Sequence, residues 1–264
     1  MHRRTPSFLL LALLLAGCSW LAIPTPRAGG GSGGDPGGGG DKPIVGGGGG
    51  PVPPILNDGA LREEPDPTIV DARPTALDHY VIGPDGRTLV IYYWGGNQGC
   101  FGLHSVAVEL RDGVPTITVS EGTRPEAVGM ACTMEAMLKS AVVTLDAPLL
   151  RDGSGAEPAA GEPQLAPQPQ AVSPVAGVVD AIAHAVNGYV LAADGRSLTA
   201  HYVGGTDKCY GLASAKVAAG PDGVPVVTIR EGRLPNAGAC DDIGVAKAVT
   251  ISLDAPLLVD GSQN

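Results

Sequence analysis

The cassette Tyr92-Tyr93-Trp94-Gly95-Gly96, followed by Cys100-Phe101-Gly102-Leu103 and closed by Ala131-Cys132, occurs twice in this chain. It returns as His201-Tyr202-Val203-Gly204-Gly205, Cys209-Tyr210-Gly211-Leu212 and Ala239-Cys240. Further matches flank both copies in the same order: Asp85-Gly86 with Asp194-Gly195, Asp112-Gly113-Val114-Pro115 with Asp222-Gly223-Val224-Pro225, and Leu145-Asp146-Ala147-Pro148-Leu149 with Leu253-Asp254-Ala255-Pro256-Leu257. An ordered series of this length indicates a tandem duplication.

Within each copy, the pattern has a period of two: Leu89, Ile91 and Tyr93 alternate with Val90 and Tyr92, and Ile117 and Val119 alternate with Thr116, Thr118 and Ser120. Asp-Gly pairs fall between such runs, where a turn must admit positive φ. The pattern predicts an all-β fold: two tandem small antiparallel β-sandwich or open-barrel domains, each with one disulfide. The segment 130–138 is expected to add one helical turn, with Met134 and Met137 filling the core.

Composition divides the chain into five segments. Residues 1–17 are expected to be a lipoprotein signal peptide, and 18–66 a lipidated cysteine with a disordered Gly/Pro-rich tether. The β repeats are expected at 67–153 and 175–264, separated by a Pro/Ala-rich linker at 154–174. Each repeat is near the lower end of independent domain size, so a covalent cross-link would help it most.

The N-terminus has the features of an export signal. Arg3 and Arg4 precede a short apolar run that ends at Leu15-Ala16-Gly17-Cys18. These four residues resemble the lipobox of bacterial lipoproteins, which implies acylation of Cys18 and a lipid anchor in the cell membrane or outer membrane. The other interpretation is a plain signal peptide with an incidental cysteine.

The charge balance limits the class of partner. The formal net charge is −10, and removal of Arg3 and Arg4 with the signal takes it to −12. Nucleic acids and anionic lipid surfaces both require a basic footprint, so the charge argues against them. An exported, soluble domain facing the periplasm or the cell exterior fits this composition.

The four cysteines after Cys18 fall two to a copy. Sequence alone permits three pairings. Duplication favours Cys100 with Cys132 and Cys209 with Cys240, because each ancestral unit had to be stable alone. A thiol metal site is the competing idea, but there is no close-spaced cysteine pair and no histidine that recurs in both copies. We therefore expect structural disulfides, no metal and no cofactor.

Candidate chemistry is sparse. The recurring carboxylates Glu121 and Glu231 each end a strand just before a glycine, but a lone carboxylate is not a catalytic pair. No set of nucleophile, base and orienting group can be assembled with any specificity. Absence of catalysis is therefore the leading expectation, and an envelope hydrolase using Glu121 or Glu231 is the alternative.

A set of aromatic side chains in the first copy is not repeated in the second. Tyr92 and Trp94 stand where the second copy has His201 and Val203, on the face opposite Leu89, Ile91 and Tyr93. With Phe101 close by, these side chains are a candidate binding surface for a glycan or peptide. A second packed layer or a contact between the repeats is the interpretation that we favour.

The ordered Trp-Gly-Gly, Cys, Asp-Gly-Val-Pro, Ala-Cys and Leu-Asp-Ala-Pro-Leu motifs resemble an uncharacterised repeat of bacterial exported proteins and lipoproteins. The resemblance covers residues 69–153 and 178–262, and it implies no activity. The sequence thus predicts a lipid-anchored envelope protein with a binding or structural role, its partner an unknown envelope protein or glycan. A sensor or assembly factor is a third possibility.

Overall fold

The computed structural model describes residues 59–111, 114–159 and 161–263. The predicted signal peptide, Cys18 and most of the tether lie outside the described residues, as does the turn at Asp112-Gly113. The described chain is almost entirely β-structure, with two short 3-10 turns, η1 (Pro125–Ala127) and η2 (Gly261–Gln263). The predicted all-β class is confirmed.

The two repeats contain equivalent strands in the same order. The first repeat contributes β1 (Leu61–Arg62), β2 (Val70–Pro74), β3 (Leu77–Ile82), β4 (Thr88–Gly95), β5 (Phe101–Arg111), β6 (Val114–Thr123), β7 (Met137–Thr144) and β8 (Arg151–Asp152). The second contributes β9 (Gln170–Ala171), β10 (Val179–His184), β11 (Val186–Ala192), β12 (Ser197–Gly204), β13 (Tyr210–Ala219), β14 (Pro225–Arg233), β15 (Val245–Ser252) and β16 (Val259–Asp260).

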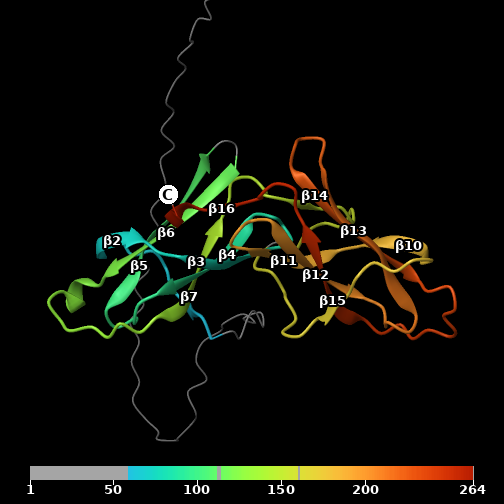
Figure 1. Ribbon diagram of the computed structural model, residues 1–264, viewed down its shortest axis with the longest axis horizontal. Helices are drawn as coiled ribbons and strands as arrows, with labels where there is room; N and C mark the ends of the chain where they lie inside the picture. The colour runs from blue at the N-terminus through green and yellow to red at the C-terminus, as the bar shows by residue number, and fades with distance from the viewer. Residues whose placement is uncertain (1–58, 112–113, 160, 264) are drawn as a thin grey trace, which may run out of the picture. The chain divides into compact units, whose positions relative to one another are not determined.

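One eight-stranded sheet runs through both repeats, in the order β1-β7-β4-β3-β11-β12-β15-β9 (Figure 1). The repeats join where β3 and β11 pair antiparallel, with Tyr80 opposite Leu191 and Ile82 opposite Tyr189. Each repeat also has its own small sheet: β16-β6-β2 with β5 on β6, and β10-β14-β13 with β8 on β14.

The short terminal strands are exchanged between the repeats. β8, at the end of the first repeat, pairs parallel with β14 of the second, and β16, at the end of the second, pairs parallel with β6 of the first. A single buried apolar cluster draws on both repeats and includes Tyr80, Ile91, Ile117, Tyr189, Leu198 and Ile229. The two repeats therefore share one core, an arrangement that the sequence analysis left open.

The recurring Asp-Gly turn is held against the recurring Leu-Asp-Ala-Pro-Leu motif. Gly86 and Gly195 have φ of +67° and +68°, in the left-handed region that glycine tolerates best. A Cβ on either glycine would overlap a backbone carbonyl, that of Leu150 or Leu258. Asp85 Oδ1 accepts a hydrogen bond of 2.9 Å from the Arg87 backbone N–H and so fixes the turn. These motifs therefore serve the fold.

The segment predicted as a linker packs onto the eight-stranded sheet. Leu165 is buried in a second apolar cluster with Val81, Val90 and Tyr92. Gln164 N–H donates to Asn187 O at 3.0 Å, and β9 pairs parallel with β15. Similarly, β1 lies within the segment assigned to the tether and pairs with β7. Ordered structure therefore begins before both predicted repeat boundaries.

The expected helical turn at 130–138 is wrong. The 3-10 turn lies earlier, at Pro125–Ala127, where a proline occupies the start of the turn. Met137 belongs to β7, and Met134 is almost fully exposed instead of filling the core.

Candidate functional site

The two recurring glutamates occupy equivalent places, each next to a Gly-Gly pair. Glu121 Oε2 accepts a hydrogen bond of 2.8 Å from the Gly96 backbone N–H, and Glu231 Oε1 accepts one of 2.6 Å from that of Gly205. A Cβ on Gly204 would lie 2.6 Å from both Glu231 carboxylate oxygens, and one on Gly95 would overlap Glu121. The first glycine of each pair is therefore required by the close approach of a carboxylate.

Each glutamate is paired with a buried lysine that the sequence analysis missed. Lys139 Nζ lies 2.6 Å from Glu121 Oε1, and Lys247 Nζ lies 2.8 Å from Glu231 Oε2. The side chains of Lys247 and Glu231 are each 1% exposed. A buried charge is stable only when it is paired and hydrogen-bonded, so each pair holds β7 or β15 of the large sheet to β6 or β14 of a small one.

A tyrosine completes the second pair. Tyr202 OH donates to Glu231 Oε2 at 3.1 Å. Burial, and after it the negative charge of Glu231, raises the pKa of the Tyr202 hydroxyl far above its ordinary value. The hydroxyl therefore stays protonated and remains a hydrogen-bond donor to the carboxylate.

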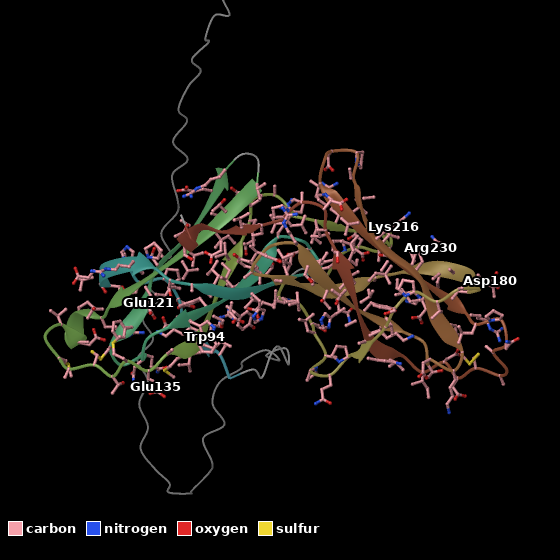
Figure 2. The ribbon with its side chains drawn as sticks, viewed as in Figure 1. Trp94, Glu121, Glu135, Asp180, Lys216 and Arg230 are labelled. Carbon is pink, nitrogen blue, oxygen red and sulfur yellow. A yellow bond between two sulfur atoms is a disulfide. The ribbon has the colours of Figure 1, made fainter. Side chains whose placement is uncertain are left out.

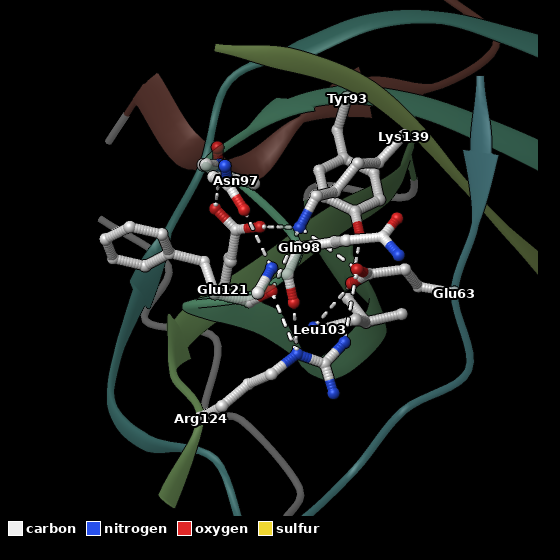
Figure 3. Close-up of polar contacts among 12 residues, drawn as sticks. Glu63, Tyr93, Asn97, Gln98, Leu103, Glu121, Arg124 and Lys139 are labelled. Carbon is white, nitrogen blue, oxygen red and sulfur yellow. Dashed lines mark hydrogen bonds and ion pairs between the residues drawn. The ribbon is translucent and has the colours of Figure 1, made fainter. Parts of the chain in front are cut away.

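The first repeat holds a larger charge network around Lys139 (Figure 3). Glu63 Oε1 lies 3.0 Å from Lys139 Nζ and 3.4 Å from an Arg124 nitrogen. Glu63 Oε2 accepts hydrogen bonds from Tyr93 OH at 3.2 Å and from the Leu103 backbone N–H at 2.8 Å. Glu63 was assigned to the tether, so the sequence analysis gave it no role.

The second repeat replaces this extra ion pair with apolar residues. The registers of β1 on β7 and β9 on β15 align Leu61 with Gln170. Counting forward from that alignment, Glu63 is equivalent to Val172, and Leu234 stands where the first repeat has Arg124. The Glu-Lys pair recurs in both repeats while its surroundings change, so that pair is the common structural element.

The predicted aromatic binding surface is wrong as a single platform. Tyr92 is buried against Val81, Val90 and Leu165 and stacks on His79, with ring centroids 4.3 Å apart. Trp94, which is labelled in Figure 2, lies in the first repeat. It is half-exposed, and its Nε1–H donates to Asp78 Oδ1 at 3.0 Å. The Phe101 ring lies against Gly96, where any Cβ would overlap it. Tyr92 thus belongs to a second packed layer.

Both predicted disulfides are confirmed. Cys100 pairs with Cys132 and Cys209 with Cys240, with Cα–Cα distances of 6.0 Å and 5.7 Å, ordinary for a disulfide. These thiols are consequently not available as metal ligands.

A surface hollow lies beside each Glu-Lys pair. In the second repeat it has a volume of about 330 Å³ and its lining includes Asp180, Ile182, His184 and Tyr210. In the first repeat the hollow has a volume of about 570 Å³, and the equivalent residues are Asp71, Arg73, Thr75 and Phe101. Asp71 and Asp180 share an unusual positive φ, 54° and 51°, at a β-bulge in each edge strand. The duplicated hollows are the best candidates for a functional site.

The fold and its cross-links define an all-β protein of two repeats with one disulfide in each, a construction that fits an extracellular or periplasmic location. In the part of the chain that the structure describes, no helix is long and apolar enough to span a membrane. Comparison of the chain with protein-family models, with curated proteins and with solved structures found no match. The resemblance to an uncharacterised lipoprotein repeat stays a prediction.

Proposed function

We propose that this protein is anchored in a bacterial cell envelope by a lipid on Cys18 and that its two repeats act there as a binding module. The lipobox-like Leu15-Ala16-Gly17-Cys18 supports the anchor, and the two disulfides agree with an oxidising compartment. A lipid chain contributes about 0.8 kcal/mol for each buried methylene, so two or three chains anchor stably.

The observation that carries the binding role is that the two repeats share the same internal framework but surround their surface hollows with different side chains. The Glu-Lys pairs, the Gly-Gly pairs and the disulfides recur in both repeats. The side chains around the hollows differ, with Arg73 and Thr75 in one repeat and Ile182 and His184 in the other. A duplicated frame that presents two distinct surfaces suits recognition of partners.

The same geometry gives little support to the alternative of a hydrolase. Glu121 and Glu231 each accept a backbone N–H and a lysine ammonium, and both carboxylates are largely or fully buried. A general acid or base must reach the substrate's proton within hydrogen-bonding distance. Carboxylates committed to holding two sheets together are poorly placed for that task, so the proposal contains no catalytic step.

The anchor is tested by replacing Cys18. Expressed in a bacterium with a lipoprotein pathway, the wild-type chain should partition into the membrane fraction and carry an acyl mass on Cys18. The variant Cys18→Ser should be recovered in soluble form, because it lacks the acylated thiol. Wild-type protein without an acyl mass would overturn the proposed anchor.

The binding role is tested by a pull-down of envelope material with the C18S chain as soluble bait. We expect one protein or glycan to be enriched and to be displaced by excess untagged chain. A retained partner that is not displaced is non-specific. Absence of any displaceable partner, or breakdown of envelope material without retention, would contradict a binding module.

A further inference from the structure

The two small sheets end in equivalent edge strands, β2 in the first repeat and β10 in the second. Each is paired along one side only, with β6 or β14, in the described part of the chain. Figure 1 shows β10 at the margin of its sheet. An edge strand leaves a row of backbone N–H and C=O groups to which an extended segment can hydrogen-bond.

The first repeat protects this edge more fully than the second, where Arg230 of β14 donates to the carbonyl of Ala181 but no charge or proline stands at Ala183. β2 carries Arg73 and Pro74 where β10 carries Ile182 and Ala183. The Thr75 N–H donates inward to Val119 O at 2.9 Å, so the neighbouring Pro74 nitrogen points away from β6. Charge and proline on an edge are common defences against strand addition. By equivalence, the Ala183 N–H points outward and is available to a partner.

The side chains beside the β10 edge form a predominantly apolar lining. Asp180, Ile182 and His184 alternate along β10 on the side of the hollow of about 330 Å³. Ile182, Val203 and Ile243 line the same hollow and are 63%, 49% and 58% exposed. Three exposed aliphatic side chains around one depression favour burial of an aliphatic side chain from a partner.

The charges around this lining are acidic. Asp180, Asp241 and Asp242 line the hollow, are exposed, and form none of the ion pairs found among the described residues. Arg233, the basic residue in the lining, donates to Gly238 O at 3.1 Å, and Glu231 is neutralised by Lys247. A partner with basic side chains would therefore complement this surface.

We propose that the β10 edge accepts an extended segment of a partner protein as an added strand. An aliphatic side chain of that segment enters the hollow, and flanking lysine or arginine side chains face Asp180, Asp241 and Asp242. This inference rests on the proposed binding function and assigns it a site and a ligand class. A second copy of the chain fits less well, because it would bring the same carboxylates together.

The test compares the two edges within the full chain carrying C18S. The probe is a fluorescent peptide with lysine, valine and lysine at every second position and threonine between them, so that these three side chains project to one face of an added strand. A peptide of equal length with glutamate in place of lysine is its counterpart. We expect one molecule of the lysine peptide to bind per chain. Ile182→Arg with Ala183→Pro copies the protected edge of β2 and should weaken binding at least tenfold. Arg73→Ile with Pro74→Ala alters the β2 edge in the opposite sense and should leave the stoichiometry at one, because Thr133 and Met134 stand where the second repeat has Asp241 and Asp242.

A charge control separates strand addition from general attraction. Val128→Arg adds the same positive charge at an exposed position of the first repeat and should leave affinity within twofold. Unfolding curves of each variant show whether the fold persists. Equal affinity of the wild type and the protected-edge variant, or no binding by the wild type, would overturn the inference. A dimer in sedimentation that the protected-edge variant abolishes would also overturn it, in favour of a second copy.

The pull-down keeps this inference distinct from the proposed function. If the partner from envelope material is retained equally by the protected-edge bait, the protein binds at another surface and only the β10 site fails. If neither bait retains a displaceable partner, the binding function itself fails.

Discussion

Lys247→Met should lower the free energy of unfolding by about 4 kcal/mol, as expected when one partner of a buried ion pair is removed. Lys247 Nζ lies 2.8 Å from Glu231 Oε2, and both side chains are out of contact with water. The substitution leaves the carboxylate in the interior with the Gly205 N–H and the Tyr202 hydroxyl as its donors among the described residues. Urea unfolding followed by circular dichroism measures the loss.

Two controls make this prediction specific. Lys247→Met combined with Glu231→Gln removes both charges and should recover most of the lost stability, because a neutral amide costs much less to bury. Arg151→Met breaks the exposed pair with Asp222 and should cost less than about 1 kcal/mol. Equal effects of Lys247→Met and Arg151→Met would show that the buried pair contributes nothing special.

Replacing both Cys209 and Cys240 by alanine should destabilise the protein by about 4 kcal/mol on the chain-entropy model for a disulfide that spans 31 residues. The equivalent change at Cys100 and Cys132, which are 32 residues apart, should have a similar effect and serves as the matched case. Because the repeats share one core, each variant should unfold in a single transition at lower urea. A loss below about 1 kcal/mol in both variants would argue that packing alone holds each repeat.

Local patterns predicted the strands well. Alternation at Leu89, Ile91 and Tyr93 marked the face of β4 that packs in the main apolar cluster, while Val90 and Tyr92 on the other face are buried in the second one. The Asp-Gly pairs marked turns because few other residues tolerate positive φ there. The duplication of the cysteines predicted the correct disulfide pairing. That prediction assumed that each unit was stable alone, whereas in the structure the repeats exchange the strands β8 and β16.

Long-range pairing left no local signal. The residue pattern of β3 does not indicate which strand it pairs with. The sequence therefore could not predict that β3 pairs with β11 of the other repeat and joins the two repeats in one sheet. β8 and β16 are two residues long, too short for any period to show. The burial of Tyr92 depends on Leu165, which arrives from a segment whose composition predicted a linker.

The buried lysines could have been found by comparing the repeats. Lys139 and Lys247 each lie near the start of a strand that otherwise alternates as a half-buried one, and they occur at equivalent positions. A recurring charge on the apolar face predicts a buried partner, and Glu121 and Glu231 were the recurring carboxylates available. The extra pair of Glu63 and Arg124 gave no such signal, because the second repeat has Val172 and Leu234 there.

Hydrogen exchange at increasing urea tests most directly whether the two repeats form one folding unit. Backbone amides of β4 in the first repeat and β12 in the second should lose protection together, at the same urea concentration and with the same free energy, because both strands line one core. If the amides of one repeat exchange in a separate step while those of the other stay protected, the shared sheet and core do not hold the protein together.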